Sequence, residues 1–164
     1  MKNIIAGIVL GIALLSNSSF AKEGKSRLVI ELQEKCDKND YSSCWLLGVF
    51  YRSGFGTQRN SVKAVELFAK ACDGGNAEGC FGLGVMYNRG EGVEQDKFKI
   101  VELYKKSCDF GYAGGCNNLG FMYDQGVTVQ QDKFKALELY GKACHLKDEQ
   151  GCSYYTKLKG ELKK

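Results

Sequence analysis

Regularly spaced cysteines are the residues of this chain best suited to chemistry. Two cysteines eight residues apart form a pair, and the pair recurs every 36 residues along the chain. The eight cysteines are Cys36, Cys44, Cys72, Cys80, Cys108, Cys116, Cys144 and Cys152. Cysteines in such patterns either ligate a metal or form disulfides. The spacing is not that of a zinc ribbon, so we expect no metal site and eight bonded, unreactive cysteines.

Two disulfide pairings respect this spacing. In the first, each cysteine bonds its partner eight residues away, and all eight are used. In the second, the bonds are Cys44–Cys72, Cys80–Cys108 and Cys116–Cys144, which leaves Cys36 and Cys152 as free thiols. The first pairing is favoured, because it leaves no odd thiol in an oxidising compartment. Each bond would then tie the end of one helix to the start of the next.

The oxidising compartment is predicted from residues 1–21. A basic start is followed by an apolar run over 4–15 and by the small residues Ser19 and Ala21. This order is typical of a secretory signal peptide, with cleavage expected after Ala21. The run is shorter than the ~20 residues that a spanning helix needs, and no later segment is apolar enough. We therefore expect a secreted or periplasmic protein without a membrane span after cleavage.

Other catalytic motifs are scarce. The chain has one Ser-x-x-Lys, the spacing used by serine β-lactamases, and it straddles the expected cleavage site from Ser19 to Lys22. A zinc β-lactamase needs several histidines, whereas His145 is alone and is expected at the surface. The net charge of +4 comes without a run of basic residues, so nucleic-acid binding is not indicated. We predict no catalytic residues, no metal and no cofactor.

The rest of the sequence follows the period of the cysteines. Leu47, Gly48 and Tyr51 recur 36 and 72 residues later, as do Gly54 and Lys63. A fixed period of this length indicates a protein of stacked repeats. Each unit is predicted to hold two helices, near 42–52 and 61–73 in the first unit. The expected buried residues of these helices are Cys44, Leu47, Gly48 and Tyr51, then Ala64, Leu67, Phe68 and Ala71.

Turn and cap residues delimit the two helices. Glycines such as Gly54 follow the first helix, where a helix end favours positive φ. Asn60, Asp96 and Asp132 stand where the second helix needs an N-cap. The repeated glycine inside the first helix costs about 1 kcal/mol against alanine, so we expect it to allow close approach of a neighbouring helix.

The domain organisation follows from the period. Residues 22–164 are predicted to form a single domain behind the signal peptide. Its parts are a capping helix within 22–40, repeats at 41–76, 77–112 and 113–148, and a capping helix within 149–164. In the last segment Thr156 and Lys159 replace the repeated glycine and tyrosine. A terminal helix has one neighbour fewer, so relaxed packing rules are expected there.

The repeated motif resembles a known family. Leu-Gly-x-x-Tyr-x-x-Gly followed by Asp-x-x-Lys-Ala-x-x-Leu-Tyr-x-Lys-Ala, clearest at 132–143, resembles the Sel1-like repeat, a relative of the tetratricopeptide repeat. The cysteine spacing further resembles the secreted Helicobacter cysteine-rich protein (Hcp) family, over residues 27–164. The resemblance implies an all-α fold, a right-handed α/α superhelix (solenoid) of disulfide-linked helical hairpins. It also implies a role in protein interaction, while Hcp members are commonly labelled penicillin-binding proteins or β-lactamases.

Two functions are consistent with these features. The first is a binding scaffold, with a peptide, a protein or a peptidoglycan fragment held in a concave groove of a monomer. The residues expected to contact the ligand lie beside the repeated core and vary between units: Trp45, Arg52, Phe81, Asn88, Asn117, Phe121 and Asp124. The alternative, implied by the Hcp label, is a penicillin-binding protein with weak β-lactamase activity.

Overall fold

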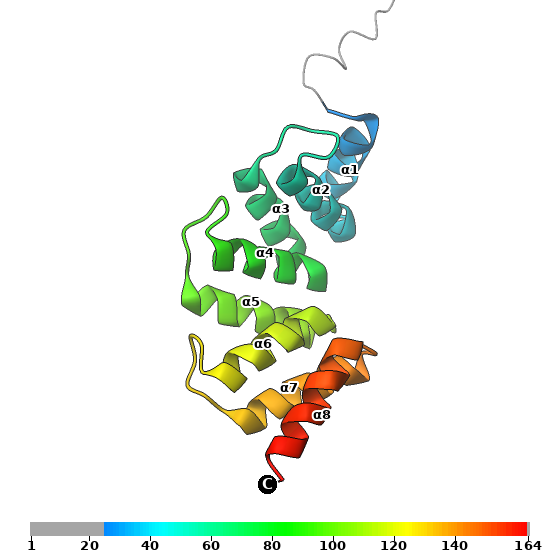
Figure 1. Cartoon of the computed structure of the whole chain (residues 1–164). Coiled ribbons are helices and arrows are strands. Elements are labelled where there is room, and N and C mark those ends of the chain that lie inside the picture. The colour runs from blue at the N-terminus through cyan, green and yellow to red at the C-terminus, as the bar shows by residue number, and fades with distance from the viewer. Residues whose placement is uncertain (1–24, 164) are drawn as a thin grey trace, which may run out of the picture.

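A stack of α-helices makes up the chain in the computed structural model, which describes residues 25–163. The described helices are α1 (Arg27–Asp37), α2 (Tyr41–Ser53), α3 (Ser61–Asp73), α4 (Ala77–Arg89), α5 (Lys97–Asp109), α6 (Ala113–Gln125), α7 (Lys133–His145) and α8 (Glu149–Glu161) (Figure 1). Each helix packs against its neighbours in the sequence, from α1 at one end to α8 at the other. The predicted all-α solenoid of 36-residue units is confirmed.

Side-chain caps explain where most helices begin. The N-cap side chain accepts a hydrogen bond from a first-turn backbone N–H in every described helix except α6, where Tyr112 has no such bond. Asn60, Asp96 and Asp132 are the N-caps of α3, α5 and α7, as predicted. The first helix of each complete hairpin ends at a glycine in the left-handed conformation, such as Gly54 with φ of 81°.

The repeated glycine lets the two helices of a hairpin touch. Gly48 of α2 faces the ring of Phe68 in α3, and a Cβ at this glycine would lie 2.8 Å from the ring. The same contact joins Gly84 to Tyr104 and Gly120 to Tyr140, with Cβ distances of 2.8 and 2.9 Å. Real Cβ atoms do not approach a ring so closely, so a side chain here would push the helices apart. The expected close approach is confirmed.

In each complete hairpin, a lysine of the second helix lies over the ring of a tyrosine in the first helix. The Nζ atoms of Lys63, Lys99 and Lys135 lie 4.8, 5.1 and 4.3 Å from the ring centroids of Tyr51, Tyr87 and Tyr123. Each pair joins the start of a second helix to the end of its own first helix. The hydrogen bond that Lys99 donates to the Tyr87 hydroxyl raises the pKa of Lys99, because it favours the charged ammonium.

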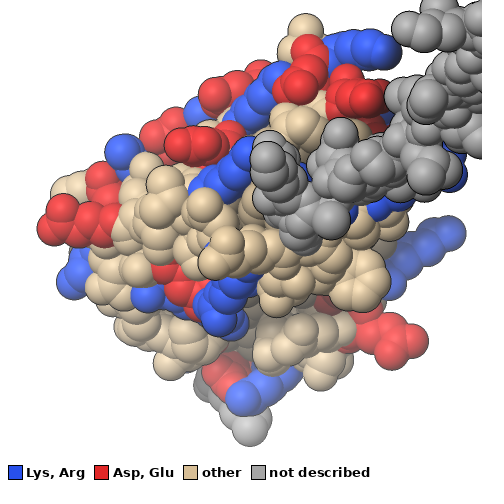
Figure 2. Space-filling view, turned by 90° about the horizontal axis from the view of Figure 1, so that it is seen from above, with Lys and Arg blue, Asp and Glu red and all other residues tan. Residues whose placement is uncertain are grey.

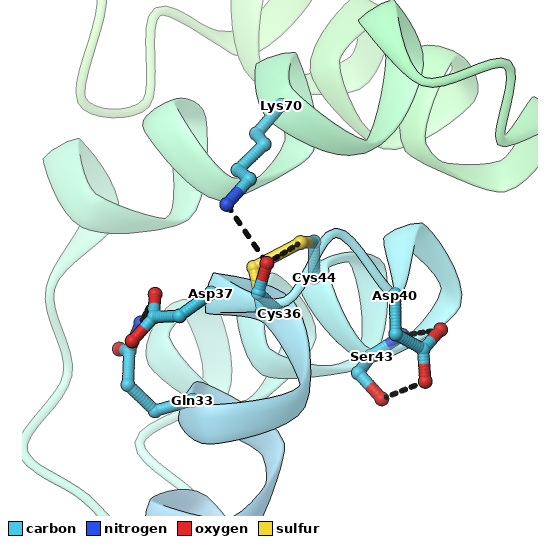
Figure 3. Close-up of a disulfide and its surroundings, with 7 residues drawn as sticks. All are labelled: Gln33, Cys36, Asp37, Asp40, Ser43, Cys44 and Lys70. Atoms are coloured by element: carbon cyan, nitrogen blue, oxygen red, sulfur yellow. Dashed lines mark hydrogen bonds between the residues drawn. A yellow bond between two sulfur atoms is a disulfide. The ribbon is translucent and has the colours of Figure 1, made fainter.

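The cysteines are bonded between hairpins, not across them. The disulfides are Cys36–Cys44, Cys72–Cys80, Cys108–Cys116 and Cys144–Cys152, which is the favoured pairing. Each joins the end of one helix to the first turn of the next, at the corner where two units meet. At the first corner, Lys70 from α3 donates a hydrogen bond to the carbonyl oxygen of Cys36 (2.8 Å), so the second helix of the first hairpin also contacts this corner (Figure 3).

Exposed polar side chains form contacts on both end helices. In α1, Glu31 and Lys35 stand where the inner units bury Leu67 and Ala71, and they form an exposed ion pair with an N–O distance of 2.8 Å. In α8, Lys159 donates a hydrogen bond to the Tyr155 hydroxyl (3.2 Å). Seen from the α1 end, acidic and basic side chains alternate around the surface and do not gather by sign (Figure 2).

The predicted signal peptide at 1–21 lies outside the described residues. Within 25–163, the structure contains no helix long and apolar enough to cross a membrane.

The glycine–aromatic contact predicts that alanine substitutions at two glycines have very different effects on stability. Gly84→Ala should lower the free energy of unfolding by about 1–2 kcal/mol, because overpacking against Tyr104 outweighs the gain in helix propensity. Gly160→Ala in α8 is the matched control, since nothing lies within 4 Å of its Cβ position. The control should be as stable as the parent or slightly more stable. Urea denaturation of the oxidised chain measures both, and equal stability of the two variants would contradict the packing account.

The corner disulfides should differ in their resistance to reductant. The cysteines of the first three bonds are buried, whereas Cys144 and Cys152 are partly exposed. Access controls thiol–disulfide exchange, so stepwise reduction followed by alkylation should label Cys144 and Cys152 first. Mass spectrometry of digests made with trypsin and a protease that cleaves after acidic residues separates the four bonds. Early labelling of Cys44 or Cys80 would be the contrary result.

Candidate functional site

The first helices of the units share one side of the stack, which we call the inner face. It is formed by α2, α4, α6 and α8 and carries the seven predicted contact residues or their repeat equivalents. Besides their chain neighbours, α2 packs against α4 and α6 against α8, while packing between successive second helices is weaker. Packing between α4 and α6 is weaker as well, so direct packing between first helices occurs toward the two ends of the stack.

Six of the predicted residues reach the surface of the inner face. Phe121 is 52% exposed and Asn88 is exposed, while Arg52 and Asp124 are half-buried. Trp45 is half-buried and packs against the core of the first units. The ring of Phe81 lies between Tyr104 and Tyr112, with centroids 5.7 and 5.0 Å away. Trp45 and Phe81 thus support the fold as well as line the face.

Asn117 differs from the other six. Its side chain is only 7% exposed and donates a hydrogen bond to Oδ1 of Asp148 (2.7 Å). The same oxygen accepts the backbone N–H of Gly151 and so caps α8. Asn117 therefore connects α6 to the start of α8, and its amide oxygen is buried without a hydrogen-bond partner among the described residues. We leave it out of the contact surface proposed below.

A hollow of about 310 Å³ opens between α6 and α8 on this side. Its lining comes from α6, the following loop, α7 and α8: Phe121, Asp124, Gln125, Gln131, Lys133, Tyr140, Tyr154, Lys157, Leu158 and Glu161. The sequence predicted Phe121 and Asp124 but missed the members from α7 and α8. The period could have revealed them, because Tyr154 and Lys157 are the repeat equivalents of Asn118 and Phe121. The prediction that 149–164 forms only a capping helix left these two residues out of the site.

Aromatic rings and a carboxylate line the hollow together. The rings of Tyr140 and Tyr154 lie 5.0 Å apart between centroids, at 45°. Burial raises the pKa of Tyr140 to about 12, and the charge of Asp124 and the neighbouring Tyr154 add to this rise. The hydroxyl of Tyr140 therefore stays protonated at neutral pH. At the side of the hollow, Lys133 and Glu161 form an ion pair at 3.6 Å.

The charge at two sets of equivalent inner-face positions changes along the stack. The same position of successive units holds Arg52, then Asn88, then Asp124. A second set of equivalent positions runs from Arg89 through Gln125 to Glu161. Arg52 thus gives the α2 end a basic group, whereas the acidic Asp124 and Glu161 occur near α6 and α8, beside Lys133 and Lys157. An elongated ligand lying along this face would meet a different electrostatic environment at each end.

A larger hollow, of about 710 Å³, lies on a different face of α7. Phe134, Leu137, Gly141 and Tyr155 give it a mostly apolar lining, and His145 stands exposed at one end. Among the residues that the structure describes, His145 has no hydrogen-bond or ion-pair partner that would make it a catalytic base. Within the described part of the chain, no group of three or more His, Cys, Asp and Glu could hold a metal ion.

Comparisons with known proteins agree with this architecture. The Sel1 repeat model matches residues 42–76, 77–112 and 113–148. No curated protein matches the chain in sequence. Among solved structures, a Sel1 repeat protein from Oxalobacter formigenes is 28% identical with a TM-score of 0.72, and the match covers 80% of this chain and 99% of that one.

Two further solved structures show the same likeness. The protein c5321, a protective antigen present in uropathogenic Escherichia coli strains and displaying an SLR fold, is 29% identical with a TM-score of 0.71. That match covers 75% of this chain and 26% of c5321. The cysteine rich protein B of Helicobacter pylori is 28% identical with a TM-score of 0.61, over 76% of this chain and 95% of that one.

Two asparagines provide a test of the inner-face assignments. Asn117→Ala should lower the free energy of unfolding by about 1–2 kcal/mol, because it removes a partly buried, charge-assisted hydrogen bond to Asp148. Asn88→Ala, at an exposed site of the inner face, should change stability by less than about 0.5 kcal/mol. Hydrogen exchange should show the Asn117→Ala loss mainly in α8. Equal effects of the two substitutions would mean that Asn117 does not hold α8.

Proposed function

The chain belongs to the Sel1 repeat family, and we propose that it is a binding scaffold that holds an extended peptide, or an extended segment of a protein, along its inner face. Stacked helical repeats supply such elongated surfaces, because each unit adds one more strip to the same side. The observation that carries the proposal is the contrast between two sets of positions. Leu47, Leu83 and Leu119 repeat the core without change, whereas Arg52, Asn88 and Asp124 differ in every unit.

This contrast supports separate tasks for the two sets. Core positions must satisfy the same packing in each unit, and Leu47, Leu83 and Leu119 are all buried. Inner-face positions are free of that demand, so their variation gives each unit a different local chemistry. A single ligand that contacts several units would then be recognised residue by residue, in a fixed direction. Extended peptides suit such a surface because their side chains occur at regular intervals.

The side chains of the inner face are of the kinds that bind peptides. Phe121 offers an exposed ring as an apolar anchor, and aromatic anchors dominate the binding energy of many interfaces. Asn88 and Gln125 are exposed amides that can both donate to and accept from a peptide backbone. Trp45 adds a half-buried ring near the basic end.

We place this activity outside the cytoplasm. Disulfides persist in oxidising compartments, and the described residues include four of them with no free cysteine. The predicted signal peptide at 1–21 points the same way. The ligand would therefore be a secreted or envelope protein, with a peptidoglycan fragment as the other class that the test below can return.

We do not extend the proposal to β-lactam hydrolysis. All eight cysteines are bonded, so none is a nucleophile. The Ser-x-x-Lys at Ser19 lies outside the described residues. The hollows described above bring together no serine with a lysine or histidine base.

Selection from a random peptide library on the oxidised chain tests the binding function. Peptides that bind the inner face should lose affinity on Phe121→Ala by ~2 kcal/mol, about 30-fold, if the ring is a central anchor. Phe98→Ala is the matched control, because Phe98 is 86% exposed on α5, away from the inner face. Isothermal titration calorimetry compares the variants. A parallel selection with muropeptides separates a peptide ligand from a cell-wall ligand.

Two results would contradict the proposal. One is a library that yields no specific binder while the same chain remains fully folded and oxidised. The other is a set of binders that loses affinity on Phe98→Ala and is indifferent to Phe121→Ala, which would move the binding surface to the second helices.

A further inference from the structure

We propose that the hollow between α6 and α8 binds an ammonium group, such as the side chain of a lysine in the bound peptide, between its aromatic rings and Asp124. This inference rests on the proposed binding function and names the chemistry of one subsite. The end of the inner face near α6 and α8 would then bind a different ligand group from the end near α2.

Aromatic rings line the hollow on three elements. Tyr140 of α7 is only 2% exposed, whereas Phe121 of α6 and Tyr154 of α8 are 52% and 36% exposed. Rings of phenylalanine and tyrosine attract a cation placed over their faces, within about 6 Å of the centroid. The volume of about 310 Å³ accepts a side chain and excludes a folded domain. An alkylammonium suits it, because its methylene groups contact the rings.

The carboxylate of Asp124 supplies the matching charge. It lines the hollow together with Tyr140, and its charge contributes to the raised pKa of that tyrosine. Gln125 donates a hydrogen bond to Oδ2 of Asp124 (3.0 Å), which leaves other lone pairs of the carboxylate for a ligand. The Tyr140 hydroxyl is neutral at physiological pH, so it does not compete as a charged group. An ammonium can therefore contact both Asp124 and the rings.

Two lysines also line the hollow, so binding depends on the sign of the charge on the ligand. Lys133 is paired with Glu161, so the charge of each is compensated. Lys157 is exposed, and its charge opposes a cationic ligand. Removing Lys157 should therefore strengthen the binding of an ammonium, while it would weaken the binding of an anion.

The equivalent positions of the other units lack this combination. One unit earlier, Val85, Asn88, Tyr104 and Asn118 replace Phe121, Asp124, Tyr140 and Tyr154. In the first unit the four residues are Val49, Arg52, Phe68 and Gly82. The carboxylate and the second tyrosine thus occur together at one end only, and an arginine stands at the other. A peptide with a basic residue near one end and an acidic residue near the other would be held in one direction.

Titration of the oxidised, ¹⁵N-labelled chain with capped pentapeptides tests this subsite. The probe is Gly-Gly-Lys-Gly-Gly, and its norleucine and glutamate counterparts replace the ammonium by a methyl group or a carboxylate. The lysine probe should shift amide resonances of α6 and α8. Asp124→Asn should weaken its binding by about three- to fivefold, as expected for a partly exposed charge pair. Lys157→Ala should strengthen it by a similar factor, and Asp73→Asn, an exposed charge change on α3, should leave it unchanged.

The outcomes separate this inference from the proposed function. If the norleucine probe binds as well as lysine, or if glutamate binds better, the ammonium subsite is wrong. If library-selected peptides shift α2 and α4 while the lysine probe leaves α6 and α8 unmoved, the subsite is again wrong and the binding function stands. If neither the probes nor any selected peptide shifts the inner face, both proposals fail.

Discussion

The disulfide at each corner sets how one unit of the stack sits on the next. Within a hairpin, α2 and α3 pack closely because a glycine meets an aromatic ring. Between hairpins, α3 packs less extensively against α4. The bond between Cys72 and Cys80 lies at this weaker junction and fixes the corner covalently. The relative position of successive first helices, and with it the inner face, depends on these bonds.

The free energy that the disulfides contribute supports this dependence of the stack on its corners. Closing a nine-residue loop stabilises a folded chain by about 2–3 kcal/mol in the loop-entropy account, so four such bonds contribute about 10 kcal/mol. A domain of this size is stable by only about 5–15 kcal/mol in total. The bonds thus account for a large share of the net stability. Inner-face residues such as Asn88 and Phe121 are correspondingly free to vary, because the fold does not depend on them.

Much of the fold could be predicted from the sequence because it depends on local, repeated interactions. The stripe of Cys44, Leu47 and Tyr51 recurs in each complete hairpin, and the N-cap of a helix lies next to the turn it stabilises. The site was less predictable, because its members meet through packing between units. Asn117 bonds Asp148, 31 residues away, and no local pattern distinguishes its buried amide from the exposed one of Asn88. Tyr154 joined the hollow from a helix interpreted only as a cap.

Hydrogen exchange of the oxidised and the fully reduced chain tests the dependence on the corner bonds most directly. Mass spectrometry follows the exchange of each helix under the same native conditions. The account predicts slow exchange from α2 to α7 in the oxidised chain and a loss of protection across these helices together after reduction. Retention of slow exchange in α2, α4 and α6 of the reduced chain would contradict it, because the stack would then hold its inner face without the disulfides.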